Sequence, residues 1–249
     1  MPHCYMMKPP TPHSITSHLP VIESNLNRLQ AELAPYPDTT LVAVTKYCTL
    51  DQMVAAYQCG LRDFGENKIQ DVAAKQPLLL AAGCPDIRWH FIGHLQSNKV
   101  NKTKPSQLSV PLHLIHSIDS LALAEKLNRA HQSDAHTQAV LLQVNLTGEA
   151  QKSGFDEATL LKDYKMLSNP AALPHLAIHG LMAMGPHPAD AEASSQCFAR
   201  LARLRDRLCH DFGALLPHLS MGMSEDYAWA LKNGATIIRV GSALFNPAH

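Results

Sequence analysis

Short apolar or β-branched runs alternate along most of the chain with longer segments in which apolar residues recur at helical spacing. Runs of the first kind are typical of buried strands, and segments of the second kind are typical of amphipathic helices. The predicted strands cover residues 40–45, 61–64, 88–92, 113–118, 139–144, 176–181, 218–220 and 236–240. Strands that alternate with helices form a parallel sheet. Eight such strands favour an α/β fold of the closed (β/α)8 TIM-barrel type over an open doubly wound sheet.

The clearest helix is predicted for residues 194–212. Its apolar side chains fall on one stripe, most of its arginines lie off that stripe, and Gly213 follows where a helix-ending glycine belongs. The stripe consists of Phe198, Leu201, Leu204, Leu208 and Phe212.

Three further helices are predicted. Residues 121–130 and 226–232 have similar spacing, and the second is expected to begin after an N-cap at Ser224 and to end before Gly234. An additional N-terminal helix, at about residues 21–33, is expected to cover the bottom of the barrel.

Length and composition fit one globular domain. The chain has 249 residues, of which 46% are hydrophobic and 17% charged, and no low-complexity linker interrupts the pattern, so residues 20–249 are assigned to a single barrel. Residues 1–19 are rich in Pro, His, Ser and Thr, lack the apolar segment of a signal peptide, and are expected to form a flexible tail. The formal net charge of +0 gives no bulk attraction to nucleic acid or to an anionic membrane.

The cysteines give no sign of a metal site. They form no CxxC pair and stand beside no His pair at zinc-finger spacing. In a chain of this length without a secretory signal, they are typical of reduced thiols in a cytoplasmic protein. No apolar run approaches the length of a membrane span. No long exposed apolar helix demands a second subunit, so a monomer is expected.

Candidate chemistry gathers where the strands end, because this face carries the active site in such barrels. Lys46 directly follows the first predicted strand, which is apolar, so its ammonium is expected to be desolvated there. Desolvation favours a neutral, nucleophilic amine. The sequence leaves this interpretation open against a lysine that extends along the rim toward Glu66 or another carboxylate.

The loops after the seventh and eighth strands, residues 220–224 and 239–242, are small and glycine-bearing, and each opens onto a helix. Backbone N–H groups at helix N-termini, together with serine hydroxyls, bind anions, and these barrels usually hold phosphate at this place. Ser224 is either a plain helix cap or a phosphate ligand. An amine that faces a phosphate site suits a phosphorylated aldehyde, of which pyridoxal 5′-phosphate is the common one.

Arg239 stands on the eighth strand just before the second loop. A guanidinium cannot release its proton, so it would donate a hydrogen bond to an unprotonated pyridine nitrogen and thereby weaken the ring as an electron sink. The alternative is an arginine that closes the barrel through an interior ion pair.

In these segments and others the chain resembles a known family, the YggS/PROSC family of pyridoxal phosphate homeostasis proteins, which have the barrel of the alanine racemase type. The matching segments run in order over about four-fifths of the chain. They are LVAVTK (41–46), FGEN (64–67), WHFIGHLQSNK (89–99), HSIDS (116–120), QVN with KSG (143–145 and 152–154), GLMAM (180–184), LSMGMS with Asp226 (219–224), and RVGSALF (239–245). The chain departs from the family pattern at Tyr47-Cys48-Thr49, where a Lys-Pro or similar pair is usual, and at Asn246, where glycine is common.

The resemblance implies roles for particular residues. Lys46 would carry the cofactor as a Schiff base, and Arg239 would face the pyridine nitrogen. The remaining implied cofactor-binding positions are Ser220, Ser224, Gly241 and Ser242 for the phosphate, and Asn67 and His90 beside the ring.

A carrier of the cofactor is expected rather than an enzyme with a dedicated reaction. Racemases of this type take their second base, a tyrosine, from a separate domain of the partner subunit, and only residues 246–249 follow Phe245 here. The family resemblance implies a role in vitamin B6 and amino-acid homeostasis, with apo-enzymes as the recipients of the cofactor. Two enzyme alternatives stay open: a weak amino-acid racemase that uses Tyr47 or water as its second acid, and a phosphosugar aldolase that uses Lys46.

Overall fold

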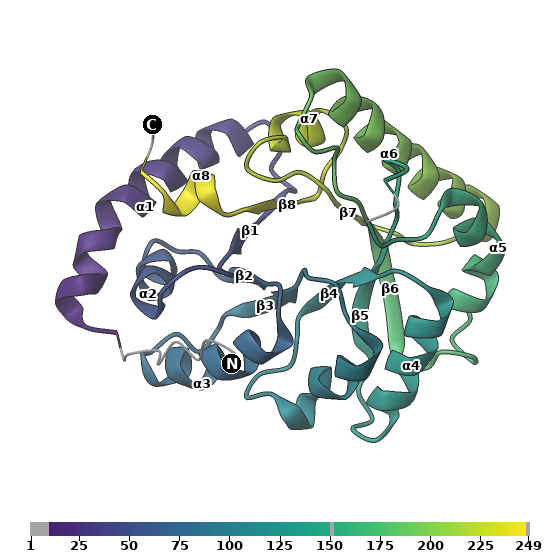
Figure 1. Cartoon of the computed structure of the whole chain (residues 1–249), viewed down its shortest axis with the longest axis horizontal. Coiled ribbons are helices and arrows are strands. Elements are labelled where there is room, and N and C mark those ends of the chain that lie inside the picture. The colour runs from purple at the N-terminus through teal and green to yellow at the C-terminus, as the bar shows by residue number, and fades with distance from the viewer. Residues whose placement is uncertain (1–9, 150–151, 248–249) are drawn as a thin grey trace.

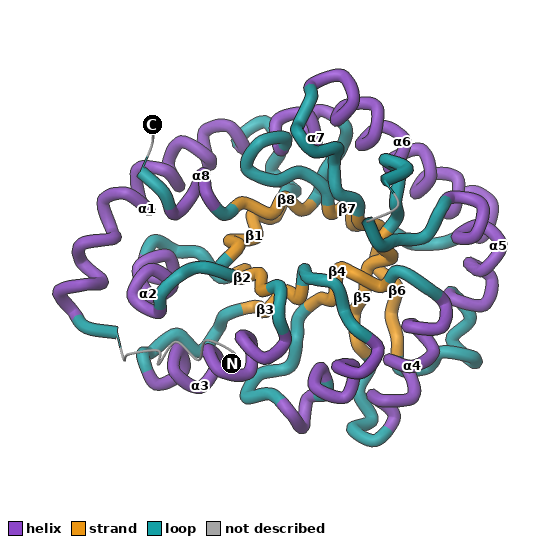
Figure 2. Tube along the Cα trace, in the orientation of Figure 1, coloured by secondary structure: helices purple, strands orange, loops and turns teal. Residues whose placement is uncertain are grey.

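The computed structural model describes residues 10–149 and 152–247. Figure 1 shows a closed barrel of parallel strands with helices around it, and Figure 2 outlines the ring of strands at its centre. The strands follow chain order around the ring, and β1 pairs with β8 to close it. They are β1 (Thr40–Val44), β2 (Asp63–Glu66), β3 (Arg88–Phe91), β4 (Leu114–Ile118), β5 (Gln138–Gln143), β6 (Leu176–Met182), β7 (His218–Ser220) and β8 (Ile237–Val240). The predicted α/β barrel is therefore confirmed.

Helices follow the strands and cover the outside of the barrel (Figure 1). They are α2 (Leu50–Gln58), α3 (Ile69–Ala81), α4 (Leu121–Gln132), α5 (Glu157–Leu167), α6 (Ala191–Phe212), α7 (Tyr227–Lys232) and α8 (Ser242–Phe245). Between β3 and β4 the chain forms two short 3₁₀ helices, η1 (Ser97–Thr103) and η2 (Pro105–Gln107), in place of an α-helix. None of the described helices is both long and apolar enough to cross a bilayer.

The long helix α6 confirms the predicted apolar stripe. Phe198 and the three leucines of the stripe are buried against the barrel, while Phe212 at the end is 40% exposed. The helix begins three residues earlier than predicted, because the Asp190 side chain accepts a hydrogen bond from the N–H of Ala193. Gly213 ends it with a φ of 64°, the left-handed conformation that glycine adopts without strain.

The N-terminal helix α1 (Pro12–Leu33) differs from the prediction in length and in place. It begins at Pro12, so residues 12–19, which the sequence assigned to a flexible tail, are helical; residues 1–9 lie outside the described part of the chain. Thr11 explains the early start, because its side chain accepts a hydrogen bond from the N–H of Ser14 and a proline follows it at the first helical position.

Helix α1 packs along the side of the barrel against α2 and α8 and does not close the bottom (Figure 1). The Asn25 side chain donates hydrogen bonds to the carbonyl oxygens of Leu244 and Asn246, at 3.0 and 2.8 Å. It thus satisfies carbonyls at the C-terminus of α8 that lack a helical partner. The helix therefore holds in place the element that follows β8.

The barrel interior is partly apolar and partly polar. A small apolar cluster inside it consists of Val42, Leu114, Leu141, Met182 and Ile237. The larger apolar core lies between the strands and the surrounding helices. Beside the small cluster, charged and polar side chains from five strands are buried: Asp63, His90, His116, Ser220 and Arg239.

Candidate functional site

Lys46 lies two residues beyond the end of β1, at the C-terminal mouth of the barrel. The expectation that its ammonium is desolvated by the strand is wrong, because the side chain is exposed. The reason is its position: β1 ends at Val44, so Lys46 lies in the turn beyond the strand and outside the packed interior. Its Nζ lies 4.9 Å from the ring centroid of Tyr47, which is 88% exposed.

Glu66 is not the partner of Lys46. The carboxylate is buried at the end of β2, where Oε1 accepts hydrogen bonds from Lys75 Nζ at 2.5 Å and from Thr45 Oγ1 at 2.6 Å. Burial raises the pKa of Glu66, and the nearby Lys75 acts in the opposite direction. Among the described residues no carboxylate lies within ion-pair distance of Lys46. The interpretation of Lys46 as a rim cation paired with Glu66 is therefore excluded.

Arg239 is a buried guanidinium, only 4% exposed, on the inner face of β8. It donates to Ser220 Oγ at 2.6 Å and to the carbonyl oxygen of Ala183 at 3.1 Å. Burial lowers its pKa to about 10, against the opposing charge of Asp226. No carboxylate of the described chain reaches ion-pair distance, so the arginine does not close the barrel through an interior ion pair.

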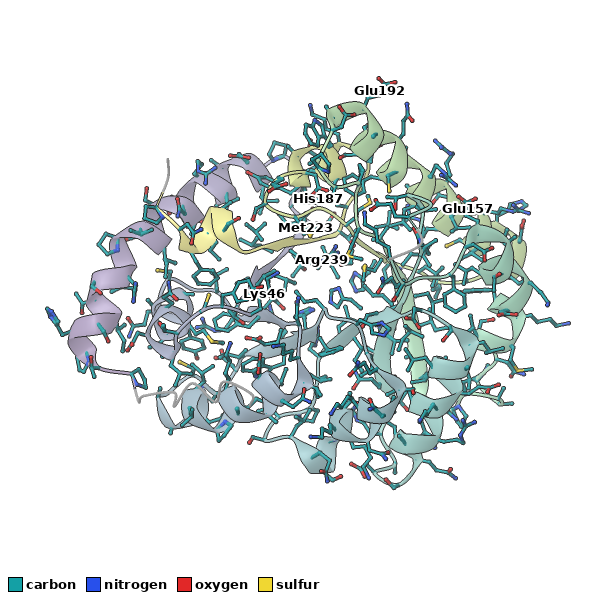
Figure 3. All side chains as sticks on the ribbon, in the orientation of Figure 1. Lys46, Glu157, His187, Glu192, Met223 and Arg239 are labelled. Carbon is teal, nitrogen blue, oxygen red and sulfur yellow. The ribbon has the colours of Figure 1, made fainter. Side chains whose placement is uncertain are left out.

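Lys46 and Arg239 both lie over the ring of strands in the view down the barrel (Figure 3). A buried guanidinium keeps its proton and can only donate. Two of its five N–H groups have the partners named above, which leaves N–H groups that suit a neutral ring nitrogen as an acceptor. On this criterion the residues present fit pyridoxal phosphate.

The loops after β7 and β8 meet at Ser224. Its Oγ accepts hydrogen bonds from the backbone N–H groups of Gly241 and Ala243, both at 3.3 Å. Ser224 thus caps the N-terminus of α8 and not, as the sequence predicted, that of α7. The residue before α7 is Asp226, whose side chain accepts a hydrogen bond from the N–H of Met223. Ser224, Gly241 and the exposed Ser242 come together, and the hydroxyls and N–H groups there can bind an anion.

A glycine shapes the first of these loops. Gly222 has a φ of 92°, and a Cβ there would lie 2.6 Å from Ala230 Cβ and 2.9 Å from Tyr227 Cα. The loop therefore passes against α7 at a distance that only glycine permits.

Two of the sequence-predicted residues, Ser220 and His90, lie inside the barrel and away from the loops. Ser220 is fully buried, and its hydroxyl contacts Arg239 and the Nδ1 of His116, at 2.8 Å. Both ring nitrogens of His90 have partners, namely Asp63 and His116. Ser220 therefore contacts the Arg239 guanidinium and not Ser224. His90 is separated from Arg239 by two hydrogen-bonded residues, Ser220 and His116.

Sequence reasoning missed two members of this interior group, Asp63 and His116. The available signal was the alternation of the strands: His116 follows the inward-facing Leu114 by two residues, so both face the barrel interior.

Asn67, in contrast, is exposed on the rim after β2, where its backbone packs on Gly93; a Cβ on Gly93 would lie 2.0 Å from the Asn67 carbonyl oxygen.

Potential metal-ligand atoms of Asp63, His90 and His113 lie within 4.8 Å of one another, and the spacing of the cysteines gives no indication of this group. The carboxylate of Asp63 is already engaged, because it accepts hydrogen bonds from Arg88 and from His90. Although burial acts to raise it, these hydrogen bonds lower the pKa of Asp63 to about 2. A cation would have to compete with the Arg88 guanidinium for the same oxygens.

Comparison with known proteins agrees with this geometry. Residues 17–248 match the family model of the alanine racemase, N-terminal domain. The pyridoxal phosphate homeostasis protein of Bos taurus is 38% identical over 213 residues, which cover 82% of this chain and 76% of that protein. The protein of the same name from Vibrio alginolyticus is 36% identical over 237 residues, 93% of this chain and 97% of that one.

Solved structures show the same relationship. PipY of Synechococcus elongatus, with pyridoxal phosphate bound, is 36% identical with a TM-score of 0.80, and the match covers 90% of this chain and 100% of PipY. Diaminopimelate decarboxylase of M. jannaschii shares the fold alone, at 12% identity and a TM-score of 0.70.

Fold and site thus define a barrel of the alanine racemase N-terminal type. Within that class, the chain belongs to the family of pyridoxal phosphate homeostasis proteins.

Proposed function

We propose that this chain binds pyridoxal 5′-phosphate at the C-terminal mouth of its barrel and acts in vitamin B6 and amino-acid homeostasis. Lys46 supplies the amine for a Schiff base, Arg239 donates to the ring nitrogen, and Ser224, Gly241 and Ser242 hold the phosphate. The cofactor, when bound, supplies an aldehyde that reacts with amines. PipY, which matches over its whole length, contains pyridoxal phosphate, and the curated relatives carry the homeostasis name.

The single observation that carries the proposal is the buried Arg239, a cation with no carboxylate at ion-pair distance among the described residues. A donor-only group at the ring nitrogen holds that nitrogen unprotonated. Without a full positive charge there, the ring withdraws electrons weakly from a bound amine. This arrangement supports a protein that holds the cofactor without a dedicated reaction.

The exposure of Lys46 supports the same function. Its amine and the neighbouring Tyr47 stand at the open rim, so water and competing amines reach this position. Enzymes that drive carbanion chemistry exclude water from the reacting atoms. An accessible lysine suits reversible loading and release, with apo-enzymes as recipients. We further propose that the protein acts as a monomer in the cytoplasm, where its cysteines stay reduced.

The second candidate function is weak amino-acid racemisation. Tyr47 favours it, because its ring lies beside the Lys46 amine and its hydroxyl could serve as a second acid. In this arrangement the lysine and the tyrosine would exchange protons with the substrate.

Proton exchange separates the two functions. The loaded protein is incubated with single L-amino acids in deuterated water, and α-deuterium incorporation and D-isomer formation are followed, with Lys46→Ala and Tyr47→Phe as controls. The carrier function predicts slow exchange that does not saturate and does not depend on Tyr47. Saturable exchange at enzyme-like rates that Tyr47→Phe abolishes would overturn it in favour of the racemase.

A further inference from the structure

A continuous series of hydrogen bonds crosses the barrel interior from Arg239 to Asp63. Arg239 contacts Ser220 Oγ at 2.6 Å, Ser220 Oγ contacts His116 Nδ1 at 2.8 Å, His116 Nε2 contacts His90 Nδ1 at 2.9 Å, and His90 Nε2 contacts Asp63 Oδ1 at 3.0 Å. The five residues are all buried, each 7% exposed or less. We refer to Ser220, His116, His90 and Asp63 as the interior chain.

The interior chain joins the two ends of the barrel. Asp63 is the first residue of β2 and pairs with Arg88, the first residue of β3, so this end lies at the N-terminal face. Ser220 is the last residue of β7, next to Arg239 on β8. The carboxylate is therefore connected, through three intervening side chains, with the guanidinium at the proposed cofactor site.

The Arg239 guanidinium at one end of the series and the Asp63 carboxylate at the other dictate the direction of every hydrogen bond between them. A guanidinium can only donate, and an ionised carboxylate can only accept. Ser220 Oγ accepts from Arg239, so its own proton is free to go to His116 Nδ1. His116 then donates from Nε2 to His90 Nδ1, and His90 donates from Nε2 to Asp63. Each ring carries one proton, on Nε2, and each link has one donor and one acceptor.

The opposite direction leaves groups unsatisfied. If His116 donated to Ser220, the serine proton would need another acceptor, and Arg239 cannot supply one. His90 would then have to donate to His116 from Nδ1 as well as to Asp63, which makes it a buried cation. Burial, followed by the nearby charges of His90 and Arg239, holds the pKa of His116 well below its ordinary value, in agreement with a neutral ring.

We propose that the interior chain positions Arg239 for the cofactor's ring nitrogen, with His116 as its central positioning residue. The inference rests on the proposed function. A residue that donates one hydrogen bond becomes a stronger acceptor of the next, because the bonds of a series polarise one another. The Asp63 carboxylate therefore makes Ser220 Oγ a better acceptor for the guanidinium. That contact fixes one end of the Arg239 fork, and the bond to Ala183 fixes a second N–H. The remaining N–H groups are thereby oriented before the cofactor binds.

The first test uses the protein without cofactor. Long-range ¹H–¹⁵N correlation spectra at neutral pH, assigned through His116→Leu and His90→Leu, report the protonated nitrogen of each ring. The interior chain predicts neutral rings with the proton on Nε2 in both. A proton on Nδ1 of either ring, or a doubly protonated His90, would overturn the stated direction.

The second test isolates the ring-nitrogen contact. Dissociation constants are measured for pyridoxal phosphate and for the benzaldehyde analogue that has C–H in place of the ring nitrogen. His116→Leu is expected to weaken pyridoxal phosphate binding about tenfold, the equivalent of one lost hydrogen bond to a charged donor, while binding of the analogue stays unchanged. An equal loss for both ligands would show a merely structural role and would overturn the proposal.

His131 provides the matched control. It is likewise a fully buried histidine bonded to a hydroxyl, Thr103 Oγ1 at 3.0 Å, but it lies on α4 outside the barrel interior. His131→Leu should leave the ratio of the two dissociation constants unchanged. Failure of the unaltered protein to bind either ligand would instead refute the proposed function, and the spectra of the cofactor-free protein would still decide the direction of the interior chain.

Discussion

Lys75 donates a hydrogen bond from Nζ to the carbonyl oxygen of Thr45, at 2.8 Å, and so ties α3 to the residue that precedes Lys46. The same ammonium pairs with the buried carboxylate of Glu66, which also accepts the Thr45 hydroxyl. Lys75 and Glu66 are 2% and 0% exposed. This buried pair, and not the strand alone, sets the position from which Lys46 projects.

Lys75→Met should destabilise the protein by about 3–5 kcal/mol, because it leaves the Glu66 carboxylate buried without its partner. Urea unfolding monitored by circular dichroism measures the change. Lys75→Met combined with Glu66→Gln should recover part of the loss, since no unpaired charge is then buried. A double variant less stable than the single one would contradict this account.

Replacement of Arg239 by Glu should change the absorbance spectrum of bound pyridoxal phosphate. A carboxylate at this position stabilises a proton on the ring nitrogen, whereas the guanidinium excludes one. Arg239→Gln serves as the neutral comparison, and Arg200→Gln, on the exposed face of α6, as the distant control. An unchanged spectrum in Arg239→Glu would show that this residue does not face the cofactor.

Ser224→Ala should weaken binding of pyridoxal phosphate roughly tenfold, the size of one hydrogen bond to a charged acceptor. It should leave the affinity for pyridoxal, which lacks the phosphate, nearly unchanged. Spectroscopic titration with the two ligands measures both values. Equal losses for both would assign Ser224 to capping α8 alone.

The stability of the protein should fall as the pH drops from about 6.5 to 4, partly through His131. Burial, followed by the nearby His136, lowers the pKa of His131 to about 4. The unfolded chain, with a pKa of about 6.5, therefore binds the proton more readily, so the contribution of His131 is complete above pH 6.5 and declines below it. His131→Leu should flatten this decline by roughly 2 kcal/mol in unfolding free energy. An identical pH profile in the variant would rule out this contribution.

The strand pattern predicted the barrel because buried parallel strands are short apolar runs, but it placed β2 two residues early. Gly65 and Glu66 belong to that strand, and a carboxylate is not expected in a buried strand unless a cation neutralises it. The cation is Lys75, which lies on α3, the helix that follows β2. The sequence does not reveal this pairing. The Thr11-Pro12 signal for the start of α1 was present in the sequence, but the Pro- and Ser-rich composition around it obscured the helix.

The rim of the site was predictable from motif and position, whereas its interior was not. Lys46 follows β1 and Arg239 lies on β8, and barrel closure pairs these two strands, so both residues come to one mouth. The contacts of Ser220 depend on which side chains of distant strands meet inside the barrel: His116 lies 104 residues before it in the chain. Such register is set by barrel closure and not by local pattern.

The identity of the lysine that carries the cofactor tests the central claim most directly. The protein is loaded with pyridoxal phosphate and reduced with borohydride, and the labelled peptide is mapped by mass spectrometry, with Lys46→Ala treated in parallel. We predict label on Lys46 alone, and neither label nor the Schiff-base absorbance band in Lys46→Ala, which should remain folded. Label on Lys99 or Lys152, or a persistent band in Lys46→Ala, would contradict the assignment of Lys46 as the cofactor's anchor.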